Sequence, residues 1–330
     1  MSEVQVGQGN FRYRVDEAWA KFPIDGDAGE AVGVACDSKD RVYVFLRGPR
    51  PVLVFERDGT PVSTWGEGVF TRAHGITIGP DDTVYCTDDF GHAVRAFSTA
   101  GKPRLMLGDG KPSDTGATSI DYRTIKQAGP PLNFPCNLAV GPTGDLFVAD
   151  GYGNARVHRF SADGELLQSW GEPGSGPGQF HVVHGIAVDQ DGIVYVADRE
   201  NLRIQLFTDE GAYLGAWTDI ARPCQVFIDN AGWVYVAELG FRAGRWPGTG
   251  MHQPGQTGGR VSIFDRQGNL QIRWGGGENP CAAGDFFAPH DICVDSHGDI
   301  YVAEVALSGG GRTGAVPGSC HSLQKFVRLA

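Results

Sequence analysis

Three of the nine histidines in the sequence stand at the same place in a recurring phrase, where their side chains could do chemistry together. His74, His184 and His290 each begin a copy that reads H-G-I or H-D-I and continues as a short apolar strand. Three imidazoles brought to one point would form a metal site with a position left open for water or substrate. Zinc suits such ligands, and iron, cobalt or manganese could replace it. The alternative is that each histidine is a packed side chain bonded to a main-chain carbonyl.

The elements that would position these histidines follow from an internal repeat. Each copy contains an apolar strand, a turn resembling D-x-x-G, and a second strand that ends in Asp or Glu in five of the six copies. A third strand, a polar turn and a fourth strand follow. Alternating Val, Ile, Tyr and Phe between Gly and Asp turns is typical of β-strands. Four strands in about 40 residues predict one blade of a β-propeller. The copies begin near Val32, His74, Cys136, His184, Cys224 and His290.

The six copies predict an all-β chain, a six-bladed β-propeller of NHL repeats that forms a single domain over residues 1–330. The last copy ends after a third strand, and residues 11–19 resemble a spare outer strand. We therefore expect the N-terminal strand to complete the last blade and close the ring. Gly/Pro-rich insertions near 109–131 and 241–258 are interpreted as loops on one face, where binding residues tend to lie.

The first strand of each propeller blade faces the central channel, so equivalent positions form a ring around the axis. Histidines in the second, fourth and sixth copies would converge on that axis. Cys136 and Cys224 share the same repeat position. They are interpreted either as additional thiolate ligands or as small buried apolar side chains. His252 and His321 fall in or near Gly-rich loops and are assigned to the surface.

Composition limits the partners and the compartment. The net charge of −11 argues against a nucleic-acid partner or an anionic membrane surface. No apolar run approaches the ~18 residues of a membrane span, and residues 1–15 lack a signal-peptide pattern. The expected location is the cytoplasm. The seven cysteines are widely scattered with no C-x-x-C pair, so we expect free thiols and no zinc ribbon.

The residues around the histidines resemble the peptidyl-α-hydroxyglycine α-amidating lyase family, whose members are six-bladed propellers. The resemblance covers about residues 33–326 and is strongest in five stretches: FLRG (45–48), AHGITI (73–78), VADGYGNARVHRFSADGELLQSWGEPGSGPGQF (148–180), VADRENLRIQLF (196–207) and PHDICV (289–294). It implies zinc bound by the three histidines named above. It also implies a structural calcium ion bound by the carbonyls of Val34 and Ile76 and the carboxylate of Asp291. Asp291 could instead be a hydrogen-bond partner of a metal-binding histidine, and turn or packing roles remain open for all three residues.

The resemblance further implies that Tyr152, in DGYGNAR, is the catalytic tyrosine and that Arg47, in FLRG, binds the substrate. Tyr152 follows a strand end, where residues of the channel mouth lie, although an aromatic side chain there could simply pack. Arg47 follows Leu46, where the other copies carry an acid, which indicates a site that favours positive charge. Arginine is suited to holding a carboxylate, and a salt bridge is the alternative.

Three features depart from the family pattern. Ala288 replaces a methionine two residues before the last histidine, and Gly153 replaces a cysteine of the secreted members. The insertion at 240–259 is foreign to the family. These departures bear on which substrate the site accepts more than on whether it binds a metal.

The resemblance thus implies a zinc-dependent lyase that cleaves a small carboxylate-bearing α-hydroxy-amide, or a related hydroxy-acid adduct, to an amide and glyoxylate. Ureidoglycolate is one candidate, because it carries the N–CH(OH)–COO⁻ unit. A metal-dependent hydrolase such as a lactonase is the first alternative. A non-catalytic NHL interaction scaffold is the second, and the acidic, single-domain character of the chain disfavours it.

Overall fold

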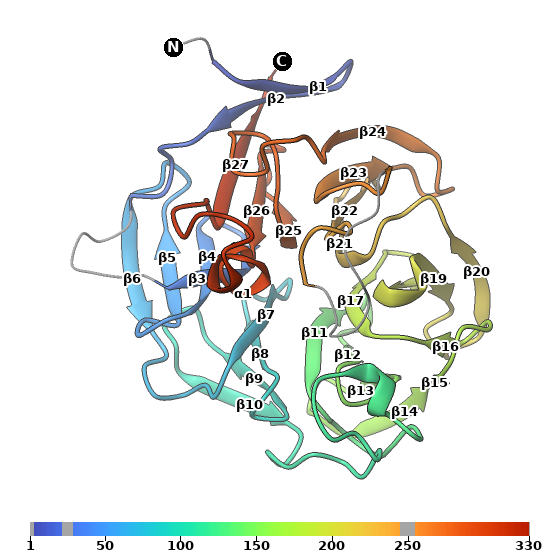
Figure 1. The fold of residues 1–330 in the computed structure, drawn as a ribbon. Helices are drawn as coiled ribbons and strands as arrows, with labels where there is room; N and C mark the ends of the chain where they lie inside the picture. Colours follow the sequence, from blue (N-terminus) through green and yellow to red (C-terminus); the bar gives the residue numbers. More distant parts are fainter. Residues whose placement is uncertain (1–2, 22–28, 245–254, 330) are drawn as a thin grey trace. The chain divides into compact units, whose positions relative to one another are not determined.

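The computed structural model describes residues 3–21, 29–244 and 255–329. These residues form six sheets of four or five antiparallel strands and one short two-stranded sheet (Figure 1). The six-bladed β-propeller class is therefore confirmed. The chain divides into two compact units, residues 66–228 and residues 1–65 with 229–330, and each is described by itself. The single domain stays a prediction.

The unit of residues 66–228 contains three complete blades, coloured from cyan to yellow-green in Figure 1. Their strands are β7 (Ala73–Ile78), β8 (Val84–Asp88), β9 (Ala93–Phe97) and β10 (Pro103–Leu107); β11 (Pro135–Val140), β12 (Leu146–Asp150), β13 (Arg156–Phe160) and β14 (Leu166–Trp170); and β17 (Val183–Val188), β18 (Val194–Asp198), β19 (Arg203–Phe207) and β20 (Tyr213–Trp217). The unit also holds β15 (Glu172–Pro173), β16 (Gln179–Phe180), β21 (Pro223–Ile228) and the 3-10 turns η1 (Tyr122–Thr124) and η2 (Arg199–Asn201).

The other unit contains the first and last blades and the remaining strands of the fifth. Its strands are β3 (Glu30–Cys36), β4 (Val42–Arg47), β5 (Val52–Phe55) and β6 (Pro61–Trp65); β22 (Val234–Glu238), β23 (Arg260–Phe264) and β24 (Leu270–Gly275); and β25 (Pro289–Val294), β26 (Ile300–Glu304), β27 (Leu323–Arg328), β2 (Phe11–Asp16) and β1 (Gln5–Gln8). A helical turn α1 (Ala306–Gly309) and a 3-10 turn η3 (Gly311–Thr313) lie between β26 and β27.

The N-terminal strand completes the last blade, as the sequence predicts. Strand β2 pairs antiparallel with β27, with Val15 opposite Phe326. Strand β1, which the sequence did not predict, pairs with β2 and makes this blade five-stranded. The blade is thus built from both ends of the chain.

The turn between the first and second strands explains why D-x-x-G recurs. In the fourth blade, Asp189 Oδ1 accepts the N–H groups of Asp191 and Ile193, both at 2.9 Å. Gly192 has φ +81°, a left-handed conformation that glycine adopts at little cost. Tyr195, on the second strand, donates its hydroxyl to the same aspartate. The turn therefore fixes the register of the two inner strands.

In the fourth blade the second strand, β18, is buried along its whole length, whereas the fourth strand, β20, is exposed or half-buried. Between the third and fourth blades, side chains such as Phe147, Val157, Ile186 and Phe207 form one hydrophobic cluster. Each such side chain contributes about 1.5–3 kcal/mol on full burial. This packing makes the inner strands rigid supports for the side chains at their ends.

The acid that ends the second strand holds the segment before the first strand of the same blade. Asp88 accepts the N–H groups of Thr71 and Arg72, both at 2.9 Å. Asp198 accepts the N–H of His181 at 2.8 Å, which lies three residues before His184. All of these carboxylates are buried, and a buried carboxylate needs such donors. The recurring acid is therefore structural, and it fixes the residues that lead to each histidine.

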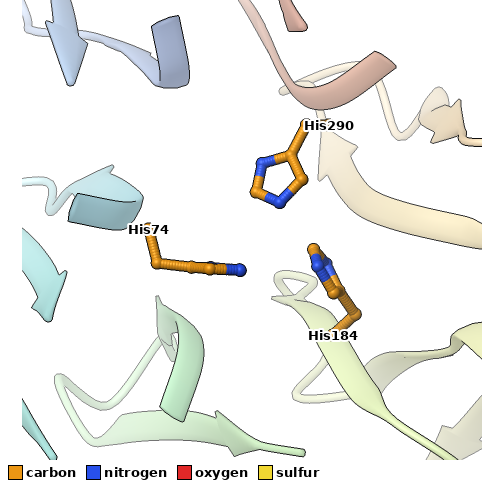
Figure 2. Close-up of side chains that lie close together, drawn as sticks. All are labelled: His74, His184 and His290. Carbon is orange, nitrogen blue, oxygen red and sulfur yellow. The ribbon is translucent and has the colours of Figure 1, made fainter. Parts of the chain in front are cut away.

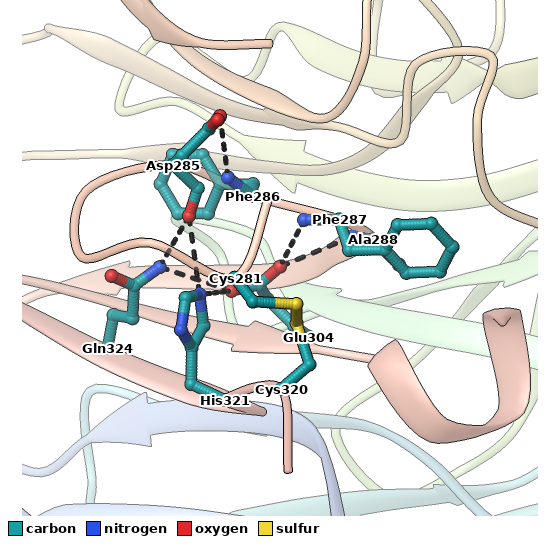
Figure 3. Close-up of a disulfide and its surroundings, with 9 residues drawn as sticks. All are labelled: Cys281, Asp285, Phe286, Phe287, Ala288, Glu304, Cys320, His321 and Gln324. Carbon is teal, nitrogen blue, oxygen red and sulfur yellow. Dashed lines mark hydrogen bonds and ion pairs between the residues drawn. A yellow bond between two sulfur atoms is a disulfide. The ribbon is translucent and has the colours of Figure 1, made fainter. Parts of the chain in front are cut away.

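The expectation of seven free thiols is wrong for two cysteines. Cys281 and Cys320 form a disulfide, and the other five are free (Figure 3). The bond joins residues 39 apart, because the segment between β26 and β27 folds back on the approach to β25. His321, assigned to the surface from the sequence, is half-buried beside this bond and pairs with Glu304 at 3.0 Å.

The structure describes the first predicted insertion in full and the second only in part. Residues 109–131 form an ordered loop that includes η1, and Thr115 in it donates its hydroxyl to the carbonyl of Gly153. Residues 245–254 of the second insertion, including His252, lie outside the described residues. No helix in the described ranges combines the length and the apolar character needed to cross a membrane.

Candidate metal centre and active site

His74 and His184 are the second residues of equivalent strands of one unit, β7 and β17, and both side chains are buried. Their ring centroids lie 4.9 Å apart. The Nδ1 atom of His74 lies 2.7 Å from the carbonyl oxygen of Cys136, and that of His184 lies 2.9 Å from the carbonyl oxygen of Cys224. A carbonyl only accepts hydrogen bonds, so each Nδ1 carries the proton and each Nε2 presents its lone pair. This tautomer is the one that binds a metal through Nε2.

The glycine after each of these histidines lets the strand approach the next blade closely. A Cβ on Gly185 would lie 2.3 Å from the carbonyl oxygen of Cys224 and 2.4 Å from the side chain of Gln225. A Cβ on Gly75 would lie 2.5 Å from the carbonyl oxygen of Cys136. Only glycine leaves room for this approach, and the approach brings each imidazole to its carbonyl.

His290 has the same main-chain contact in the other unit. It is the second residue of β25, is buried, and its Nδ1 lies 2.7 Å from the carbonyl oxygen of Val32. His290 is thus prepared in its unit in the same way as His74 and His184 are in theirs (Figure 2). Imidazole nitrogens with the lone pair on Nε2 are the donor set that zinc prefers.

Tyr152 lies directly against the histidine pair of its unit. It follows β12, is buried, and its Oη lies 3.1 Å from Nε2 of His184. Its ring centroid is 5.3 Å from that of His74 and 5.5 Å from that of His184, both edge to face. Because Nδ1 of His184 carries the proton, the hydroxyl donates to Nε2. The structure therefore brings the predicted catalytic tyrosine to two of the predicted metal ligands.

Arg199 completes this group and was missed in the sequence. Its Nη1 donates to Oη of Tyr152 at 3.0 Å, and its side chain is buried. Burial raises the pKa of Tyr152, while the Arg199 charge acts to lower it. Arg199 follows the recurring acid of its copy, the position that Arg47 occupies in the first copy, and this match could have revealed it.

A carboxylate fixes Arg199 from the other side. Glu200 Oε1 accepts from Nε of Arg199 and from Nη2 of Arg222, each at 2.8 Å. Burial alone would raise the pKa of Glu200, but the two guanidinium groups outweigh it and hold that pKa below its ordinary value. Glu200 is therefore ionised at neutral pH and keeps Arg199 aimed at Tyr152.

Arg47 ends β4, in the unit that holds His290. Its Nη1 lies 3.4 Å from Oε2 of Glu30 and 3.1 Å from the hydroxyl of Ser308 on α1. Glu30 is buried, and its other oxygen accepts the N–H of Ser308. Although position 46 is Leu46 rather than an acid, the positive charge of Arg47 is still paired. Glu30 on the adjacent strand provides the negative charge.

The residues implied for calcium are divided between the units. Asp291 and Val34 lie in one unit and Ile76 in the other. Asp291 Oδ2 accepts the N–H of Val34 at 3.1 Å, and Oδ1 accepts the N–H of Ile292 at 2.9 Å. Gln225 binds the N–H of Ile186 in the same way in the other unit. The structure gives Asp291 a role in joining two blades, and its role toward calcium stays a prediction.

The cysteines at the repeat position of the histidines are fully buried. Burial raises the pKa of the Cys224 thiol to about 11 and raises that of Cys136 further. Full burial is what a small apolar side chain at this position would show, and the role of these cysteines as thiolate ligands stays a prediction.

Comparisons with known proteins agree with this fold and site. An NHL repeat is matched over residues 180–207. The chain is 37% identical over 222 residues to NHL repeat-containing protein 3 of Homo sapiens, covering 63% of this chain and 60% of that protein. The Mus musculus protein of that name is 34% identical over 244 residues, covering 69% and 67%. The peptidyl-alpha-hydroxyglycine alpha-amidating lyase 1 of Drosophila melanogaster is 30% identical over 300 residues, covering 82% of this chain and half of that protein.

Solved structures share the fold at low sequence identity. A gluconolactonase from Xanthomonas campestris gives a TM-score of 0.62 at 15% identity, covering 100% of this chain and 96% of that one. A virginiamycin B lyase from Staphylococcus aureus gives 0.59 at 14%, covering 96% and 100%. At this identity the likeness establishes the fold alone.

The fold defines a six-bladed β-propeller, and three of its first strands carry buried histidines whose Nδ1 atoms contact main-chain carbonyls. The chain belongs to the NHL-repeat protein family, and its relation to the α-amidating lyases is confirmed. It spans 60% of the human protein and 50% of the Drosophila lyase.

Proposed function

We propose that the chain is a metal-dependent lyase that cleaves a small α-hydroxy-amide, or a related hydroxy-acid adduct, to an amide and glyoxylate. The observation that carries this proposal is the buried group in which Tyr152 contacts His184 and Arg199 contacts Tyr152. A metal ligand, a candidate proton acceptor and a fixed cation meet there. The lyases among the relatives support the reaction class.

The metal in this proposal is zinc, bound by His74, His184 and His290. The support is that each Nδ1 donates to a main-chain carbonyl, at 2.7, 2.9 and 2.7 Å respectively. The three side chains are thus prepared in the same tautomer. When bound, the metal supplies a Lewis acid that makes a substrate hydroxyl more acidic.

Tyr152 moves the proton in this scheme. Ionised beside Arg199, it accepts the proton of the substrate hydroxyl through Oη. The carbon–oxygen double bond of glyoxylate forms as the carbon–nitrogen bond breaks, and the electron pair goes to nitrogen. Tyr152 then returns the proton to that nitrogen, which gives the amide. Arg199 favours the ionised tyrosine, which burial alone disfavours.

Arg47 is proposed to hold the carboxylate of the substrate, with Glu30 and Ser308 fixing its guanidinium. Alignment by such a contact lowers the entropic part of the barrier. A structural calcium ion at Asp291, Val34 and Ile76 is part of the same proposal and acts on the scaffold rather than on the reaction.

The compartment and partners also remain proposals. The partner is a small carboxylate-bearing molecule, with no nucleic acid and no membrane surface, consistent with the net charge of −11. The cytoplasm was predicted from the sequence. The Cys281–Cys320 disulfide favours an oxidising compartment instead, because reducing compartments keep thiols free. Fractionation of cells that express the full protein decides between them.

The test uses protein purified without a histidine tag. We expect stoichiometric zinc, and glyoxylate released from ureidoglycolate or an N-acyl-α-hydroxyglycine. Chelation should abolish release, and added zinc should restore it. A metal-loaded protein that releases no glyoxylate from any such substrate contradicts the proposal.

The same assay separates the alternatives. In ¹⁸O-labelled water a hydrolase incorporates solvent oxygen into its product in the bond-cleaving step, whereas elimination forms the carbonyl from the oxygen already present. The glyoxylate must be trapped at once, because its hydrate exchanges with water. A folded protein without stoichiometric metal indicates the interaction scaffold.

A further inference from the structure

Arg72 is a second arginine beside the histidine pair, and the proposed reaction does not use it. It stands two residues before His74, on the segment that Asp88 holds by the N–H groups of Thr71 and Arg72. Asp88 is fully buried. The main chain of Arg72 is therefore fixed to the blade that carries His74.

The guanidinium of Arg72 is fixed on one edge and on one face. Its Nε donates to both carboxylate oxygens of Asp89 at 2.9 Å, and Nη2 pairs with the same carboxylate. Its central carbon lies 3.9 Å from the ring centroid of Phe90. Nη1 makes no hydrogen bond within the described part of the chain, and 23% of the side chain is exposed. One edge of a rigid, planar donor group thus remains available to a ligand.

Arg72 lies near the proposed reaction centre, because it stands two residues before His74 on the same segment. The charge of Arg72 interacts with Tyr152 and Cys136, and Tyr152 contacts both histidines of the unit. Phe90 is 42% exposed and packs edge to face against Phe134, two residues before Cys136. An exposed aromatic ring beside a fixed arginine is typical of a recognition surface.

We propose that Arg72 and Phe90 form a subsite for a carboxylate on the amide side of the substrate. This rests on the proposed function, in which Arg47 takes the carboxylate next to the hydroxyl. Two separately fixed arginines then select a dianionic substrate, in which an acyl chain ends in a second carboxylate. Phe90 packs against the apolar part of that chain, and Arg72 binds its end through Nη1.

The test compares N-succinyl-α-hydroxyglycine with N-butyryl-α-hydroxyglycine, which lacks the second carboxylate at nearly the same size. We expect kcat/KM to favour the succinyl compound by about 10- to 100-fold, the range of one charge-assisted hydrogen bond. The preference should appear mainly in KM. Equal values for the two compounds overturn the subsite and leave the lyase proposal intact.

Asp89 is fully buried, so loss of Arg72 alone could prevent folding. The variants are therefore Arg72→Lys and the double variant Arg72→Leu with Asp89→Asn. Both should lose the succinyl preference and keep turnover of the butyryl compound. Arg104→Leu is the matched control, because Arg104 is an exposed arginine of the same blade paired with Asp81. An equal fall for both compounds assigns Arg72 a structural role instead.

Binding of the product amides tests the subsite without turnover. Calorimetry should show that succinamate binds the unaltered protein more tightly than butyramide does. The difference should disappear in both Arg72 variants and persist in Arg104→Leu. If neither hydroxyglycine is cleaved but this difference is found, the lyase proposal fails and the anion subsite stands. Equal binding of the two amides overturns the subsite.

Discussion

His184 in one unit and His290 in the other follow segments that a buried acid holds through main-chain N–H groups. Asp198 binds the N–H of His181, and Arg203 pairs with this aspartate at 2.8 Å. Glu304 binds the N–H groups of Phe287 and Ala288, at 3.0 and 3.2 Å. The partner of Asp198 is an arginine, which stays charged at every physiological pH. Glu304 has a different set of partners.

Glu304 is completed by His321 and Gln324, and His321 adjoins the Cys281–Cys320 disulfide (Figure 3). A repeat can therefore keep a structural acid while its neighbours change. In the region of His184, burial raises the pKa of Asp198 to about 6, so this region responds to pH but contains no bond that a reductant breaks. The other depends on a titratable imidazole and on a covalent bond.

The largest expected effect tests whether the two regions serve one metal. His184→Ala and His290→Ala should each lower kcat by about 10³-fold or more, because several kcal/mol of Lewis-acid stabilisation are lost. Metal content, measured on folded protein, should fall in both. His297→Ala, an exposed histidine of the last blade, is the control. Full activity and full metal content in His290→Ala would show that only the unit of His184 holds the centre.

Tyr152→Phe sharpens the comparison, because Tyr152 lies in the same unit as His74 and His184 and contacts both of them there. The change removes the hydroxyl between His184 and Arg199 and should lower kcat by about 10²–10⁴-fold, the usual range for a general acid–base group. Zinc content should be unchanged. Tyr122→Phe, which keeps the ring packed against His181, is the matched control. Unchanged kcat in Tyr152→Phe would remove the tyrosine from the mechanism.

The disulfide should matter for stability in one region only. Replacing Cys281 and Cys320 by serine should lower the free energy of unfolding by about 2–4 kcal/mol, because the unfolded chain regains the entropy of a closed loop. Urea unfolding measures the change. Cys36→Ser, a free thiol of the same unit, should have little effect. Reductant should destabilise the unaltered protein and leave the double variant unaffected; equal sensitivity of both would contradict the bond.

The smallest effect is a pH dependence at His321. Burial lowers the pKa of His321, but the hydrogen bond and charge of Glu304 outweigh it, so the net pKa is raised above 6.5. Its stabilisation is fully present below the unfolded pKa of about 6.5 and is lost as the pH rises through the higher folded pKa. His321→Gln should therefore lower Tm by about 2 °C at pH 6 and by less at pH 9. A difference that grows with pH would reverse the assignment.

Much of the fold could be predicted because blade signals are local. Strand alternation, the D-x-x-G turn and the recurring acid are each set by a few neighbouring residues, and their repetition indicated six blades. The shared repeat position of His74 and His184 likewise predicted their proximity. Strand β1 gave no such signal, since it belongs to no copy of the repeat.

The sequence by itself determined the blades, the strand that completes the last one, and the equivalence of the three histidines. Tertiary structure alone decided which groups meet there: the carbonyls that set the histidine tautomers, Arg199 on the tyrosine, and Glu30 on Arg47. It also decided the disulfide between cysteines 39 residues apart. The physical reason is that strand patterns arise from neighbours in sequence, whereas hydrogen bonds, ion pairs and disulfides depend on how separate segments pack.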